Sequence, residues 1–379
     1  MRTSKLNSLT GLRGTAALMI VIYHSLLPWP HDVFTRAVTE LGFMGVQFFF
    51  CLSGFVMQWT WREKQFKVIQ FLIKRVARIY PVAILGLCIS FFSFKLFQTP
   101  LAGYVGGRHS ISMSALLVQS WLYNKPDVRQ SWDGVSWTLS CEIFFYLVSP
   151  LTVPLINKLN LRATITSFIV AVLAYYAWNI IETPKPSYAA LIANNFFTYS
   201  PLGNLPLYLL GSLLARILIT SRGISYKFNV PVIFLLSIII PLFLAHDYYN
   251  IAYANILALS VIPGFLLIIL VSANNDLTET RRRPDFLHSK PLLFLGNISF
   301  SLYMMHALVL GAFCLALAHL HVTVSSAWLG DVLTVAYFVV SVLVAAAVYY
   351  CVEEPVYAAA AGLLPAEKRK ATFPTHATN

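Results

Sequence analysis

The sequence predicts an all-α protein, a polytopic membrane bundle of about ten transmembrane helices. The first observation behind this prediction is composition: 58% of the residues are hydrophobic and 11% are charged, whereas a soluble domain carries about 25% charged residues. Such a chain has too little polar surface for a shell that faces water. The second observation is that its basic residues lie mostly in short segments between long apolar runs.

A transmembrane helix needs about 20 mostly apolar residues. We predict ten spans, at 9–28, 41–59, 82–98, 137–156, 164–181, 201–219, 230–245, 251–271, 293–317 and 331–351. The run 111–123 is apolar but shorter, so we expect a re-entrant or interfacial segment there. Residues 1–363 are expected to form one membrane-embedded domain, and 364–379 a short polar cytoplasmic tail.

The basic residues predict which side each loop faces, because cytoplasmic loops of membrane proteins are enriched in Lys and Arg. Ten spans with both termini in the cytoplasm make every inner segment basic. The outer side then keeps only Arg36, Lys95, Arg108, Lys125, Arg129 and Lys185. Topology and anionic lipid therefore account for the net charge of +12, and we expect the bilayer, and no nucleic acid, as a partner.

The first predicted span carries an arginine and a histidine on one face. Arg13 and His24 are eleven residues apart, which is three helical turns, with about 16 Å of rise and only about 20° of angular drift. A charge near the centre of a span costs on the order of 2.5–3.5 kcal/mol, so it usually has a function or a partner. The alternative is that Arg13 extends to inner headgroups and His24 bonds a backbone carbonyl.

A basic stretch at 62–78 precedes the third predicted span. Arg75 and Arg78 stand at i and i+3, so they share a helical face. Pro81 disfavours helix at Tyr80, and we expect a break there. Two arginines that converge at a membrane surface suit the bidentate capture of phosphate groups. The alternative is an ordinary basic loop on anionic lipid.

The fourth predicted span begins with polar residues at helical spacing. Thr138, Glu142 and Tyr146 repeat at i+4 and share one face. A carboxylate just inside a span can orient a histidine or accept its charge. The alternative is a structural ion pair between Glu142 and a buried arginine.

The ninth predicted span repeats this arrangement with Ser299, Tyr303 and His306 on one stripe. These residues either line a cavity or form hydrogen bonds between helices. The cysteines show no CxxC or CxxH spacing, so we expect no metal site.

These segments, in this order, resemble the acyltransferase-3 family of integral membrane acyltransferases, of the polysaccharide O-acetyltransferase type. The pieces that carry the resemblance are GLRG (11–14) with YH (23–24), GVQFFF (45–50), LSGF (52–55), RVARIYP (75–81), SWTLSCE (136–142), ISFSLYMMH (298–306) and EEP (353–355). The likeness covers nearly the whole chain. Many relatives carry Asp where this chain has Thr10, and often an acidic residue at Gln47, so neither position is given a role.

The resemblance implies ten core helices in the cytoplasmic (inner) membrane and an enzyme that transfers acetyl groups to surface or exported carbohydrates. Acetyl-CoA, or another acyl-CoA, is the implied donor, and no bound cofactor is expected. The family's key histidine and arginine of the first span fall on His24 and Arg13. Its arginine pair falls on Arg75 and Arg78, which would bind the donor.

We therefore expect His24 to activate an acceptor hydroxyl, with Glu142 orienting it if their helices pack together. Ser136, Trp137, Tyr303 and His306 are expected to line the same cavity. A transient acyl-histidine at His24 is an equal alternative to direct transfer. The rival classes are a proton-coupled secondary transporter of a small polar solute, which would use the buried ionisable residues as a relay, and a structural or receptor-like membrane protein.

Overall fold

The structure is a computed structural model that describes residues 6–26, 28–31, 42, 44–62, 67–102, 105, 108–181, 196–221, 252–277 and 286–364. These residues form helices and connecting loops without a β-strand, which confirms the all-α class. The long helices are α1 (Asn7–Ser25), α3 (Gly45–Thr60), α4 (Val68–Phe97), α7 (Trp137–Asn157), α8 (Leu161–Ile181), α11 (Pro201–Thr220), α13 (Ala252–Leu277), α15 (Ser299–His319) and α16 (Ala327–Val348). The shorter ones are α5 (Arg108–Ala115), α6 (Pro126–Arg129), α10 (Phe196–Tyr199), α14 (Lys290–Asn297) and α17 (Glu354–Gly362).

Within the described residues, five segments are long and apolar enough to cross a membrane: Val68–Phe97, Trp137–Asn157, Pro201–Thr220, Ser299–His319 and Ala327–Gly362. The predicted span 230–245 lies outside the described residues, and each of the others overlaps a described helix. The apolar run 111–123 forms α5 and a short 3₁₀ turn, Gln119–Leu122. The count of ten spans and the cytoplasmic termini stay predictions, and the tail beyond Leu364 is outside the described part.

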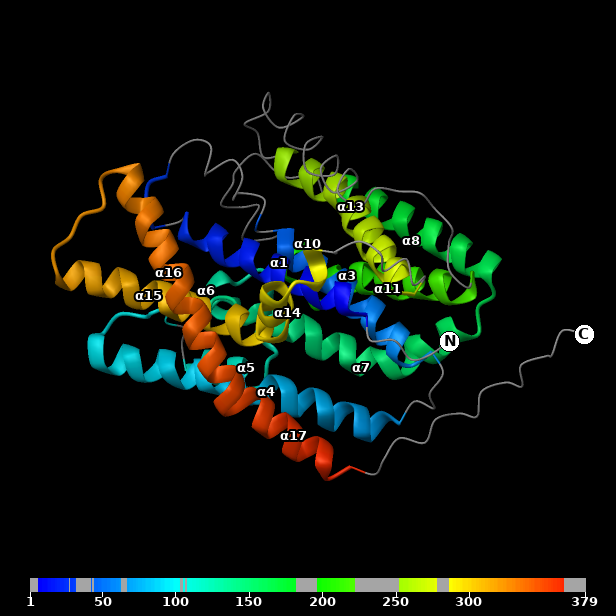
Figure 1. Cartoon of the computed structure of the whole chain (residues 1–379), viewed down its shortest axis with the longest axis horizontal. Coiled ribbons are helices and arrows are strands. Elements are labelled where there is room, and N and C mark those ends of the chain that lie inside the picture. The colour runs from blue at the N-terminus through cyan, green and yellow to red at the C-terminus, as the bar shows by residue number, and fades with distance from the viewer. Residues whose placement is uncertain are drawn as a thin grey trace, which may run out of the picture.

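Helix α1 lies in the middle of the bundle and packs on α3, α14 and α15 (Figure 1). The most extensive helix contact joins α3 to α11. It depends on Gly54 and Gly211, because a Cβ on Gly54 would overlap the Tyr208 carbonyl and one on Gly211 the Cys51 carbonyl. Small residues let helix backbones approach in this way when lipid surrounds the bundle.

Helix α4 differs from the prediction, because it continues through Pro81 without a break. The expected third span began at residue 82, but the helix begins at Val68, so the arginine pair stands on the helix itself. Pro81 removes one hydrogen bond to the carbonyl four residues earlier. Membrane helices tolerate such a residue because neighbouring groups satisfy the freed carbonyl and the rest of the helix keeps its bonds.

The predicted span 293–317 is also divided differently. Helix α14 ends at Asn297 and α15 begins at Ser299, with Ile298 between them. Farther on, α16 passes into a π-helical turn, Tyr349–Glu353, and then into α17. Helix α17 packs against α4 (Figure 1). This arrangement brings Glu353 toward the arginines of α4.

Two polar contacts fix the ends of α1. At its beginning, Asp276 of α13 accepts hydrogen bonds from the backbone N–H (2.9 Å) and hydroxyl (2.8 Å) of Ser8. Beyond its other end, the His31 Nδ1 lies 2.8 Å from Asp331 Oδ1 of α16. The helix that carries Arg13 and His24 is therefore held at both ends.

Candidate active site

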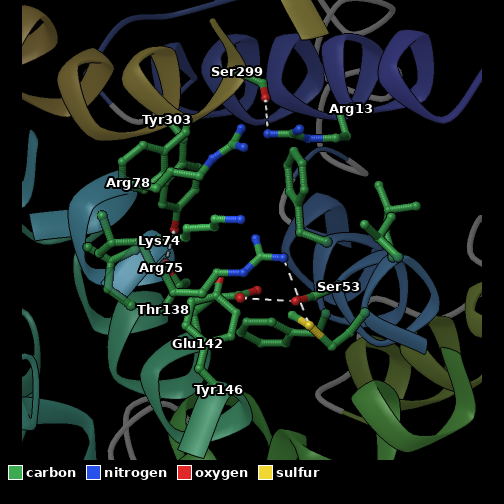
Figure 2. A pocket seen from close by; sticks show the side chains of 18 of the residues that line it. Arg13, Ser53, Lys74, Arg75, Arg78, Thr138, Glu142, Tyr146, Ser299 and Tyr303 are labelled. Carbon is green, nitrogen blue, oxygen red and sulfur yellow. Dashed lines mark hydrogen bonds between the residues drawn. The ribbon is translucent and has the colours of Figure 1, made fainter. Parts of the chain in front are cut away.

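A cavity of about 420 Å³ lies between α1, α3, α4, α7 and α15 (Figure 2). Known small-molecule sites range from about 300 to 1,000 Å³. Its polar and charged lining side chains are Arg13, Ser53, Thr60, Lys74, Arg75, Arg78, Thr138, Glu142, Ser299 and the tyrosines 146, 303 and 357. Its apolar wall is mostly aromatic and aliphatic side chains of α3, such as Phe49, Phe50 and Val56.

Four cations face this cavity, whereas Glu142 is the one acidic side chain among the described residues that line it. Figure 2 shows the side-chain nitrogens of Arg13, Lys74, Arg75 and Arg78 turned toward a common space. Outside the lining, Glu353 lies near Arg78 and Arg13. The described lining is rich in positive charge, which suits a ligand that carries negative charge.

The arginines use few of their donors on the protein. Arg75 packs over the rings of Tyr146 and Phe71, at 5.2 and 5.5 Å, and donates one long bond, 3.8 Å, to the sulfur of Met57. Arg13 donates one hydrogen bond of 3.0 Å to Ser299 Oγ. Since a guanidinium has five N–H donors in a planar fork, both keep donors for a ligand.

Arg78 also has an acidic neighbour, Glu353, that is not part of the lining of the main cavity. Its Nε lies 3.9 Å from Glu353 Oε1, and the second oxygen of Glu353 accepts a bond of 2.6 Å from Ser301. A second, smaller cavity of about 200 Å³ lies there, and Thr10 lines it together with Arg13 and Arg78. The π-helical turn is what places Glu353 at this point.

Glu142 lies deep in the main cavity. It accepts a hydrogen bond of 3.0 Å from Ser53 and a second from the Tyr146 hydroxyl, and it interacts electrostatically with Arg75. The predicted common face of Thr138, Glu142 and Tyr146 is confirmed, since all three line the cavity. The alternative, a structural ion pair between Glu142 and a buried arginine, holds in part, because Glu142 interacts electrostatically with Arg75.

One end of the cavity is closed by a contact between α7 and α15. The Tyr303 hydroxyl donates to the carbonyl of Val135 at 3.1 Å. The single proton of the Thr138 hydroxyl goes either to that carbonyl or to the Tyr303 oxygen, each at 3.1 Å. Beside this contact lies Asp133, which is buried. Burial raises the pKa of the Asp133 carboxyl from its ordinary value of 3.8 to about 7.

Beyond this closed end lies a pair of histidines. The His306 Nε2 is 3.3 Å from the His24 Nδ1, and the two rings meet edge to face at 4.8 Å between centroids. His306 is fully buried. His24 therefore faces α15 inside the bundle, and the predicted stripe of Arg13 and His24 points at one helix, because Arg13 also reaches α15.

The contact predicted between Glu142 and His24 is not formed. The hydrogen bonds of His24 go to the Ile20 carbonyl and to His306, and those of Glu142 go to Ser53 and Tyr146. The reason is the packing order, since α1 packs chiefly on α3, α14 and α15, whereas α7 packs chiefly on α3 and α11. The bond of His24 to the Ile20 carbonyl matches the alternative in which His24 bonds a backbone carbonyl.

The cavity gathers some of the predicted residues and leaves others out. Arg13, Arg75, Arg78, Glu142 and Tyr303 line it, whereas His24 and His306 lie just beyond its closed end. Ser136 and Trp137 are not in its lining. Ser136 instead bonds Gln119 and the Asp133 carbonyl, and the Trp137 ring packs on Tyr199 at 4.9 Å.

Four polar side chains of the lining were missed: Lys74, Ser53, Tyr357 and Thr60. Lys74 stands next to Arg75 and could have been found from the same basic run. Ser53 lies in the LSGF piece, but no spacing signal shows that it faces Glu142. Tyr357 reaches the cavity because α17 packs on α4, a contact that no local pattern indicates.

The described helices are long and apolar, and several of them surround a cavity rich in cations, which is the arrangement of a membrane protein with an internal small-molecule site. The chain belongs to the acyltransferase-3 family, whose acyltransferase domain matches residues 6–350. It is 31% identical to the acyltransferase MdmB of Streptomyces mycarofaciens over 326 residues, which is 82% of this chain and 80% of MdmB. It is 24% identical to the O-acetyltransferase OatA of Staphylococcus aureus over 337 residues, 79% of this chain but only 50% of OatA.

No solved structure matches the chain. The family and the apolar helices together make this protein a multi-pass membrane enzyme that transfers acyl groups. The predicted family and enzyme class are therefore confirmed. The enzyme class also decides against the transporter and receptor alternatives.

Proposed function

We propose that the protein is a membrane O-acyltransferase that moves an acetyl group from acyl-CoA to a hydroxyl of a surface or exported carbohydrate. The observation that carries the proposal is the cavity whose described lining holds four cations and one carboxylate. The similarity to OatA, an O-acetyltransferase, supports acetyl as the group transferred. The proposed location is the cytoplasmic membrane.

Coenzyme A is the donor that the cationic lining of this cavity supports. It carries three phosphate groups on an elongated, less polar pantetheine arm. Arg75 and Arg78 would hold phosphate oxygens through pairs of N–H donors, the geometry in which arginine binds phosphate best. The aromatic and aliphatic wall formed by α3 would receive the arm. The thioester would then lie near the closed end of the cavity, at Thr138 and Tyr303.

His24 would supply the base for the transfer. The acceptor hydroxyl gives its proton to His24, its oxygen attacks the thioester carbonyl, and the coenzyme A thiolate leaves and takes the proton from the imidazolium. Such proton transfer contributes typically 10²–10⁴-fold to a rate. The surrounding apolar helices would exclude water and protect the thioester from hydrolysis. An acyl-histidine at His24 remains the second route.

The proposal is tested with acetyl-CoA and purified protein in nanodiscs. We expect acetyl-CoA to bind, and to be converted to free coenzyme A faster when a membrane extract that contains the glycan acceptor is added. In cells, O-acetyl on surface glycans should disappear in a deletion strain and return with the wild-type gene. Binding without turnover of any glycan fraction would contradict the carbohydrate acceptor, and absence of binding would contradict the donor.

A single-turnover reaction separates the two routes. A rapid quench with labelled acetyl-CoA and no acceptor should leave label on the protein if an acyl-histidine forms. Label that stays entirely on acetyl-CoA until the acceptor is added indicates direct transfer. Arg162→Gln, on the exposed start of α8, serves as a matched variant that should behave as wild type in all of these assays.

A further inference from the structure

His306 carries a role that its burial alone does not explain. It lies on α15, one turn beyond Tyr303, and its ring contacts that of His24 at the closed end of the cavity. Both imidazoles also contact a backbone carbonyl of their own helix. These three contacts are enough to assign the protons on the ring nitrogens.

The proton of a neutral His306 is placed by its backbone contact. Its Nδ1 lies 2.6 Å from the carbonyl oxygen of Tyr303, which can only accept a hydrogen bond. Nδ1 must therefore carry the N–H. A neutral imidazole with N–H at Nδ1 has a lone pair at Nε2, and this is the nitrogen that faces His24.

The same reasoning applies to His24. Its Nδ1 lies 2.8 Å from the carbonyl oxygen of Ile20 and 3.3 Å from the His306 Nε2. Both neighbours are acceptors, so Nδ1 carries the proton and shares it between them. The lone pair of His24 is then on Nε2, which forms no hydrogen bond with the described residues.

We infer that His306 is a positioning residue, which accepts a hydrogen bond from the Nδ1–H of His24 and thereby holds His24 with its Nε2 as the base. This inference rests on the proposed role of His24. The contact does for His24 what a carboxylate does for a catalytic histidine in the better-known triads, namely fix the tautomer and the ring plane. A neutral acceptor does so without a second buried charge in the bilayer.

The arrangement also suits the charged state of the reaction. When His24 Nε2 takes the proton of the acceptor hydroxyl, the ring becomes an imidazolium whose Nδ1–H still faces two acceptors. The Ile20 carbonyl and the His306 Nε2 then both stabilise the positive charge, because charge-assisted hydrogen bonds are stronger than neutral ones. The proton returns to the leaving coenzyme A thiolate and both rings regain their starting state.

The test compares His306→Leu, which removes the acceptor, with His306→Gln, whose amide oxygen can take the place of Nε2. We expect His306→Leu to lower kcat for acetyl-CoA turnover by about 10–100-fold with an unchanged KM, and His306→Gln to recover most of that loss. In a His24→Ala background, His306→Leu should have no further effect. His319→Leu, the same change at an exposed position of α15, is the matched control and should keep full activity.

Several outcomes would overturn the inference. These are a wild-type kcat in His306→Leu, an equal loss in His306→Gln, or an additive loss in the double variant with His24→Ala. Folding is checked from thermal unfolding of each variant in detergent.

An independent measurement separates this inference from the proposed function. In ¹⁵N-histidine-labelled protein, His24 should show a protonated Nδ1 and an unprotonated Nε2, and this pattern should be lost in His306→Leu. A protonated Nε2 on neutral His24 would refute the positioning role even in an active enzyme. The expected pattern in a protein that never releases coenzyme A would refute the proposed function instead, and the catalytic part of the inference with it.

Discussion

The two sides of the Tyr303–Thr138 contact differ sharply in charge. On the cavity side, Glu142 is the one carboxylate among the described lining residues, which include Arg13, Lys74, Arg75 and Arg78. On the other side, two imidazoles bond to backbone carbonyls and to each other, and Asp133 is a carboxyl whose pKa is raised by burial. The charged side is suited to hold a polyanion, and the uncharged side is suited to move a proton.

This contrast predicts that one substitution can abolish acyl transfer and leave donor binding intact, and that another can do the reverse. The largest effect is expected on the uncharged side. His24→Ala should lower the rate of acyl transfer by about 10³–10⁴-fold, toward the upper range for a lost general base. Acetyl-CoA binding, measured by calorimetry, should stay as in wild type, because His24 is not in the lining of the cavity. A parallel loss of binding would show that the two sides are not independent.

The buried carboxyl of Asp133 predicts that the stability of the folded protein depends on pH. Its folded-state pKa, about 7, lies above the ordinary value, so the folded protein retains a proton that the unfolded chain releases. The stability contributed is present below about pH 4 and is lost as pH rises through 7, by roughly 4 kcal/mol at most. Asp133→Asn should therefore raise the unfolding temperature at pH 8 and flatten its dependence on pH. An equal pH slope in both proteins would contradict this assignment.

The arginine pair is expected to show the opposite kinetic pattern. Arg75→Met and Arg78→Met should each raise KM for acetyl-CoA by about 10–100-fold, since hydrogen bonds to charged groups contribute about 1.5–3 kcal/mol. The value of kcat at saturating donor should change little. The measurement is a donor titration at two salt concentrations, with Arg162→Gln as control. A fall in kcat alone would show that the arginine pair acts in the chemical step and not in binding the donor.

The smallest effect is expected at the contact between Tyr303 and Thr138. Tyr303→Phe keeps the ring but removes the hydroxyl that bonds Thr138 and Val135. Each neutral hydrogen bond contributes about 0.5–1.5 kcal/mol, so the closed end should loosen. We expect hydrolysis of acetyl-CoA without acceptor to rise by about two- to tenfold, measured as coenzyme A release. Unchanged hydrolysis would mean that the hydroxyl does not separate the two sides.

Much of the fold could be predicted because lipid imposes a simple rule on sequence. Long apolar runs separated by basic segments predicted helices at the positions where α7, α8 and α11 lie. Boundaries were less predictable where helices continue or stop within an apolar run. Pro81 did not interrupt α4, and the break at Ile298 has no proline to mark it.

The site could be predicted along each helix but not between helices. Periodicity placed Thr138, Glu142 and Tyr146 on one face, and Arg13 and His24 on another. It could not show that the partner of His24 is His306 and not Glu142, because the order in which helices pack depends on contacts far apart in the sequence. Glu353 lies close to Arg78 because of a π-helical turn, and no residue pattern predicts that turn.

The contact of Tyr303 with Thr138 also bears on the voltage across the membrane. Moving one elementary charge through a bilayer at 100 mV involves about 2.3 kcal/mol, so an open aqueous path beside four cations would act as a leak for ions. In the proposed function, the group transferred is an acetyl group, which is uncharged and small, and it would pass this contact only while the two side chains are parted. The closed contact would then keep the membrane electrically tight at all other times.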